Sequence, residues 1–90
     1  MPRLYNTTSD SSQPIDTLAE LIAAMPADPR IPSIYSLDDV PGFIVRIVYG
    51  SPVRNQSEVC VFTASGVDKD TLNSTSAATD RFLAIARHAF

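Results

Sequence analysis

The sequence predicts a small α+β domain in which two amphipathic helices pack on one face of a three-stranded antiparallel sheet. Apolar residues recur at helical spacing soon after the N-terminus and again up to the C-terminus. Between these two stretches lie segments rich in β-branched and aromatic residues. The expected order is therefore helix, strand, strand, strand, helix (α-β-β-β-α). A chain of 90 residues is long enough for one such domain.

The first helix is expected to follow a flexible tail. Residues 1–12 are polar and without hydrophobic period, which leaves residues 13–90 as the folded domain. Pro14 suits the first turn of a helix, and Ser12 is a suitable cap before it. Pro26 disfavours helical geometry in the residue before it and ends the element. The apolar stripe of this helix comprises Ile15, Leu18, Leu21, Ile22 and Met25.

Three strands are expected in the middle of the chain. The first covers residues 34–37 and is followed by a turn at Pro41-Gly42. The second, residues 43–49, is almost entirely β-branched or aromatic. The third, residues 58–64, would lie at the edge of the sheet. Residues 67–73 are expected to form a loop or a first helical turn.

The last helix is expected from about Ser74 to the C-terminus, with Ser74 or Thr75 as its cap. Its apolar residues fall on one side at helical spacing, so this side should cover the sheet. They are Ala78, Phe82, Leu83, Ile85, Ala86 and Ala89.

Charge and cysteine content narrow the classes of function. The net charge is −3, with one lysine, so a dominant basic face for nucleic acid is excluded. Cys60 is the sole cysteine, so no intrachain disulfide forms, which fits a reducing compartment. No apolar run reaches the roughly 20 residues that span a bilayer. We therefore expect a soluble, intracellular and cytoplasmic protein.

The sequence carries no pattern that predicts catalysis, a metal or a cofactor. Cys60 lies in an apolar strand, where a buried thiol is the simpler interpretation. His88 is the only histidine and has no metal-ligand spacing around it. Asp38 and Asp39 fit a turn, and the segment 68–70 lacks the glycine and glutamate of a calcium loop. We expect a protein that is not an enzyme.

Several short motifs resemble the double-stranded-RNA-binding domain over residues 14–90. They correspond in that family to the start of the first helix, the start of the first strand, the alternating core positions of the second strand, and the cap and core positions of the last helix. These motifs are Pro14-Ile15-x-x-Leu18-x-Glu20-Leu21, Pro32-x-x-Tyr35, Phe43-x-Val45-x-Ile47, and Ser74 with Ala78, Ile85 and Ala86.

The resemblance implies RNA contacts at the first helix, at the loop between the first two strands and at lysines that open the last helix. Glu20 matches the first of these positions. The loop is reduced to residues 40–42 without the family's histidine, and residues 75–79 contain no lysine. Because such binding depends on neutralising phosphates, we expect weak or no RNA binding. The alternative is a true double-stranded-RNA-binding protein that uses Glu20, Arg30, Arg54 and Arg81.

Family members of this kind bind proteins instead, and the predicted sheet has apolar side chains on both faces. The main hypothesis is a protein-interaction module that homodimerises or docks on a partner protein. It would use the edge strand 58–64 and the face of the sheet away from the helices. The alternatives are tolerated surface apolar residues, or a small viral or bacterial inhibitor or adaptor. The expected interface residues are Ile44, Arg46, Val48, Val59, Val61 and Phe62.

Overall fold

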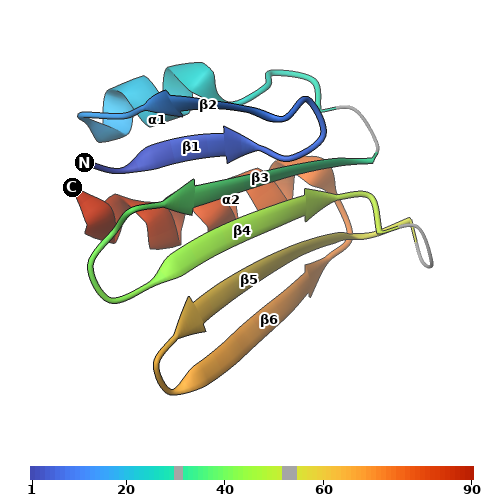
Figure 1. Cartoon of the computed structure of the whole chain (residues 1–90). Coiled ribbons are helices and arrows are strands. Elements are labelled where there is room, and N and C mark those ends of the chain that lie inside the picture. Colours follow the sequence, from blue (N-terminus) through green and yellow to red (C-terminus); the bar gives the residue numbers. More distant parts are fainter. Residues whose placement is uncertain (30–31, 52–54) are drawn as a thin grey trace.

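The computed structural model describes residues 1–29, 32–51 and 55–90. In these residues the chain forms a six-stranded antiparallel sheet in the order β2-β1-β3-β4-β5-β6, with two α-helices behind it (Figure 1). The α+β class is confirmed, but the expected α-β-β-β-α order with three strands is wrong. The elements are β1 (Arg3–Asn6), β2 (Ser11–Pro14), α1 (Leu18–Ala24), β3 (Ser33–Asp38), β4 (Ile44–Tyr49), β5 (Ser57–Thr63), β6 (Gly66–Leu72), α2 (Thr75–Ala86) and a final 3₁₀ turn (Arg87–Ala89).

The N-terminal residues form a hairpin, so the expected flexible tail at residues 1–12 is wrong. β1 pairs with both β2 and β3, which places it inside the sheet. Leu4 on β1 lies opposite Leu37 on β3, and both side chains are almost fully buried. The hairpin turns through Asp10, whose φ of 52° lies in the left-handed region that aspartate tolerates. One buried leucine in a polar segment gave too little periodicity to predict a strand.

Helix α1 begins four residues later than expected, because Pro14 ends β2 instead of opening the helix. Ile15 is buried in the connection, where its N–H donates to the Pro2 carbonyl at 2.8 Å. Thr17 caps the helix by accepting from the Glu20 N–H at 3.1 Å. Of the expected stripe, Ile22 is 52% exposed, whereas Leu18, Leu21 and Met25 pack into the core.

The central strands follow the predicted alternation. On β4, Val45, Ile47 and Tyr49 are fully buried beneath the helices, and the residues between them point the other way. Strand β5 lies between β4 and β6, so the expectation that 58–64 is an edge strand is wrong.

Strand β6 is the edge strand, where a loop or a helical turn was expected. It follows a two-residue turn and begins at Gly66, whose φ of 137° is open to glycine and strained for other residues. All of its side chains except that of Leu72 are exposed. The sequence of β6 shows no alternation of apolar and polar residues, because most of the strand is exposed on both faces of the sheet and burial therefore demands no apolar residues there.

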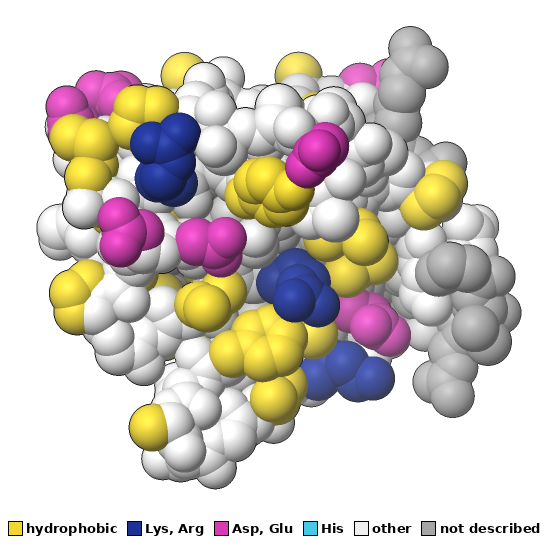
Figure 2. All heavy atoms as spheres, viewed as in Figure 1, with side chains coloured by type: hydrophobic (Ala, Val, Ile, Leu, Met, Phe, Trp, Pro, Cys, Tyr) yellow, Lys and Arg dark blue, Asp and Glu magenta, His cyan; other side chains and the backbone are white. Residues whose placement is uncertain are grey.

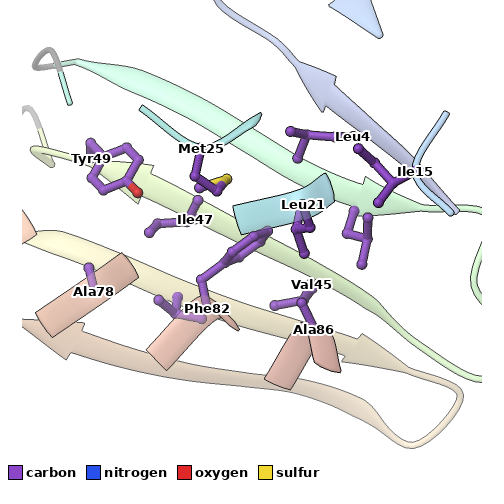
Figure 3. Close-up of a cluster of buried hydrophobic side chains, with 12 residues drawn as sticks. Leu4, Ile15, Leu21, Met25, Val45, Ile47, Tyr49, Ala78, Phe82 and Ala86 are labelled. Carbon is purple, nitrogen blue, oxygen red and sulfur yellow. The ribbon is translucent and has the colours of Figure 1, made fainter. Parts of the chain in front are cut away.

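Helix α2 closes the core as predicted. Ser74 caps it by accepting from the Ala77 N–H at 3.0 Å. Phe82 points from α2 into the middle of the apolar cluster, near Leu21 of α1 and Ile47 of β4 (Figure 3). Both helices therefore bury their stripes on the same face of the sheet. No helix within the described residues is long and apolar enough to cross a bilayer.

Candidate protein-binding face

The sheet has a second face, on the side away from α1 and α2. This outer face is turned toward the viewer in Figure 1, and Figure 2 shows hydrophobic side chains gathered over its lower strands next to basic ones. Antiparallel partners point to the same side, so the strand register gives its members from β3 to β6. They are Ile34, Ser36, Asp38, Ile44, Arg46, Val48, Glu58, Cys60, Phe62, Val67, Lys69 and Thr71.

Three apolar side chains lie side by side across this face. Ile44 on β4 is paired with Phe62 on β5, which is paired with Val67 on β6. We call these three residues the apolar row. Ile44 is 40% exposed and Val67 is 60% exposed, and Phe62 is half-buried between them. Contiguous apolar surface of this kind is typical of binding sites, whereas isolated exposed apolar residues are ordinary.

The apolar row borders a shallow open groove at the same end of the sheet. Its walls come from the β3–β4 connection and from the end of β5. Gly42 lies in this connection with φ of 94°, a conformation that favours glycine. The groove extends the apolar surface beyond Ile44 and Phe62. Its lining residues are Val40, Gly42, Phe43, Ile44, Phe62, Thr63 and Ala64.

Two cations flank the apolar row on the neighbouring row of the sheet, with Cys60 between them. The Arg46 guanidinium carbon lies 4.8 Å from the centroid of the Phe62 ring, which is within cation–π distance. The Lys69 Nζ lies 3.9 Å from Glu58 Oε1. Among the described residues, Arg46 has no carboxylate within 4.0 Å, and its exposed guanidinium contacts the Phe62 ring.

Cys60 is nearly buried beneath these groups. Burial raises the pKa of its thiol, and the nearby Glu58 carboxylate raises it further, against a smaller lowering by Arg46 and Lys69. A raised pKa means little thiolate at neutral pH, which agrees with a packing role for this side chain.

The expected interface residues divide between the two faces of the sheet. Ile44, Arg46, Val48 and Phe62 lie on the outer face. Val59 and Val61 lie on the helix side, where Val59 is 1% exposed and Val61 packs against the core. These two valines are therefore corrected to core positions, because a partner on the outer face cannot reach them.

Of the four residues named for RNA binding, the structure describes Glu20 and Arg81, and each is engaged by a neighbour in its own part of the chain or sheet. Glu20 lies on α1, where its Oε2 accepts from the Asp16 N–H at 3.2 Å. Arg81 on α2 donates from Nε to Asp70 Oδ2 at 2.8 Å. Arg30 and Arg54 lie outside the described residues. The family resemblance that suggested these positions stays a prediction, whereas the three-stranded layout predicted from the sequence pattern is wrong.

Val67 and Lys69 were missed because residues 67–73 were not assigned to a strand. The alternation of Val67, Lys69 and Thr71 after Gly66 is the signal that could have placed them opposite β5. No group of three or more acidic, histidine or cysteine side chains within the described residues is arranged to hold a metal ion. No protein-family model, curated protein or solved structure matches this chain.

Proposed function

We propose that this chain is a non-catalytic protein-interaction domain whose outer face binds another polypeptide, with weak or no binding of double-stranded RNA. The observation that carries the proposal is the apolar row of Ile44, Phe62 and Val67, exposed on a face without helices. Burying exposed apolar area contributes about 25 cal/mol per Å², so such a row favours association once a partner covers it. An intracellular setting is part of the proposal, since the chain has a single cysteine.

The charges on β6 favour the outer face over the sheet edge as the binding site. If two copies paired antiparallel along β6 with Lys69 opposite Lys69, each Asp68 would face an Asp70. Shifting the register brings Asp68 opposite Asp68 or Asp70 opposite Asp70. Like charges directly opposite each other destabilise a strand pair, and charged residues are a common protection of edge strands.

The proposal of weak RNA binding is supported by the ion pairs that engage two of the basic side chains. Arg81 is engaged by Asp70, and Lys69 lies beside Glu58. With a net charge of −3, the chain offers few free cations to release counterions from a duplex. A gel-shift titration at low salt with a duplex of about 20 base pairs should detect no tight complex.

A matched pair of lysine substitutions tests the proposed face. Ile44 on the outer face and Ile22 on α1 are both exposed isoleucines, at 40% and 52%. A photo-crosslinking amino acid is placed at position 44 or at position 22 in the source cells, and the cross-linked protein is identified and purified. Its affinity is then measured for the wild-type chain and for the Ile44→Lys and Ile22→Lys variants.

We expect a discrete product from position 44 and at least about tenfold weaker binding by Ile44→Lys, because the charge must be desolvated in the interface. Ile22→Lys should bind like the wild type. Equal affinity of both variants, or products from position 22 alone, would remove the outer face as the binding site. Unchanged far-ultraviolet circular dichroism of both variants confirms that each still folds.

A further inference from the structure

The unpaired charge of Arg46 indicates what kind of partner the outer face accepts. Strand register gives Arg46 two diagonal neighbours on β5, Glu58 and Phe62. On β3 the register places the Asp38 carboxyl diagonally on its other side, beyond ion-pair distance. Its guanidinium lies over Phe62, and Glu58 lies beside Lys69 instead. Arg46 is thus an exposed cation beside the apolar row and has no carboxylate within 4.0 Å in the described residues.

A guanidinium that contacts a ring still needs hydrogen-bond acceptors for its five N–H donors. Arginine prefers a planar bidentate partner, and a carboxylate supplies one with charge-assisted hydrogen bonds. A partner that covers Phe62 also removes water from Arg46. Covering it without supplying an acceptor would leave a desolvated charge unpaired, which is costly.

We infer that the partner presents an acidic side chain to Arg46, next to apolar side chains that cover Ile44, Phe62 and Val67. This inference rests on the proposed function and adds the chemistry of the partner. A basic or purely apolar segment is disfavoured, because it would cover Arg46 without compensating it. Lys69, 57% exposed at its side chain, adds a second positive charge on the same side of the row.

The acidic character of the whole chain does not oppose this local preference. Its net charge is −3, and on the outer face the carboxylates of Asp38 and Glu58 are matched in number by Arg46 and Lys69. At physiological ionic strength the screening length is about 8 Å, so distant carboxylates contribute little at Arg46. The charged groups nearest to Arg46 therefore decide which charge a partner must present at the outer face.

Two synthetic peptides of equal length test the inference. One alternates glutamate with leucine and phenylalanine, and the other has lysine in place of each glutamate. Each is titrated into the ¹⁵N-labelled chain while backbone amides and the Arg46 Nε–H signal are followed by nuclear magnetic resonance. The titrations are repeated with Arg46→Gln and with Arg87→Gln, a control arginine that is exposed beyond the end of α2.

The acidic peptide should shift Arg46, Phe62 and Val67, and Arg46→Gln should weaken its binding at least about tenfold while Arg87→Gln leaves it unchanged. Equal binding of both peptides at the outer face would overturn the acidic partner and leave the proposed function standing. If neither peptide shifts this face, and no partner is found by crosslinking, both ideas fall. Shifts at this face that depend on chain concentration without peptide would identify a second copy as the occupant and also overturn the inference.

Discussion

Strands β4 and β6 belong to the same sheet, with only β5 between them, yet their surroundings are opposite. On β4, Val45 and Ile47 are fully buried, whereas β6 is exposed along nearly its whole length. The difference follows from where the helices lie, since α2 packs closely behind β4, whereas on β6 only Leu72 packs against the core. In this protein, a strand carries apolar residues where a helix covers it. A strand that the helices leave mostly uncovered, such as β6, is held in the sheet by backbone hydrogen bonds to its neighbour.

This contrast separates apolar residues that stabilise the fold from apolar residues that are available for binding. Ile47 and Ile44 lie on the same strand and differ in which face they occupy. The first packs beneath the helices, and the second belongs to the apolar row. Four substitution experiments test this distinction between covered and uncovered positions.

The largest effect is expected from Ile47→Ala, which leaves a cavity in the core. The free energy of unfolding should fall by about 2–5 kcal/mol. Ile44→Ala removes the same atoms from the outer face and should cost less than about 1 kcal/mol. Urea unfolding of both variants measures the difference. Equal losses would mean that the two faces do not differ as described.

A similar loss is expected from Leu4→Ala on the N-terminal hairpin. Leu4 is 3% exposed, so its truncation should cost about 2–5 kcal/mol. Gln13→Ala, at the exposed position opposite it on β2, should change stability by no more than about 0.5 kcal/mol. If residues 1–12 were a flexible tail, Leu4→Ala would be as neutral as Gln13→Ala.

An intermediate, pH-dependent effect is expected from Tyr49→Phe. The only hydrogen of the Thr79 hydroxyl is donated to the Thr75 carbonyl, so the Tyr49 hydroxyl donates to Thr79 Oγ1. Losing this bond should cost about 0.5–1.5 kcal/mol near neutral pH.

Burial raises the pKa of Tyr49 above its usual value of about 10. The stability linked to its protonated form is therefore complete below about pH 10 and is lost as the pH rises toward the higher folded value. The wild type should lose more stability above about pH 10 than Tyr49→Phe does, so the difference between them should shrink. A difference that grows with pH would contradict the buried phenol.

The smallest effect is expected at the uncovered edge. Arg81 and Asp70 form an ion pair whose side chains are each about half exposed. Arg81→Gln should cost about 0–1 kcal/mol, and added salt should reduce even that difference. A loss as large as that of Ile47→Ala would show that the edge is more strongly coupled to the core than its exposure indicates.

The elements that pack between the sheet and the helices could be predicted from the sequence. The alternation of residues 43–49 and the spacing of Ala78, Phe82 and Ala86 reflect one buried face each, and both were assigned correctly. Ser74 was one of the two residues expected as the cap, because a hydroxyl before a helix accepts from an unpaired backbone N–H of the first turn.

The uncovered half was not open to prediction in the same way. Leu4 is the single fully buried side chain of its hairpin, and β6 has none, so no repeat of buried apolar residues marks either region. Pro14 suits both the end of an edge strand and the start of a helix, and only pairing with Arg3 decides between them. Missing β6 also misplaced the sheet edge and hid Val67 and Lys69 from the candidate site.

The placement of β1 between β2 and β3 has a consequence for assembly. Two segments that are distant in the chain meet there, so the hairpin completes the sheet by docking on β3 after the chain has looped back through α1. If the hairpin detaches, the same groups on β3 can accept the hairpin of another molecule. Exchange of this segment would link two chains by domain swapping, with the pairing of β1 and β3 re-formed between the two molecules.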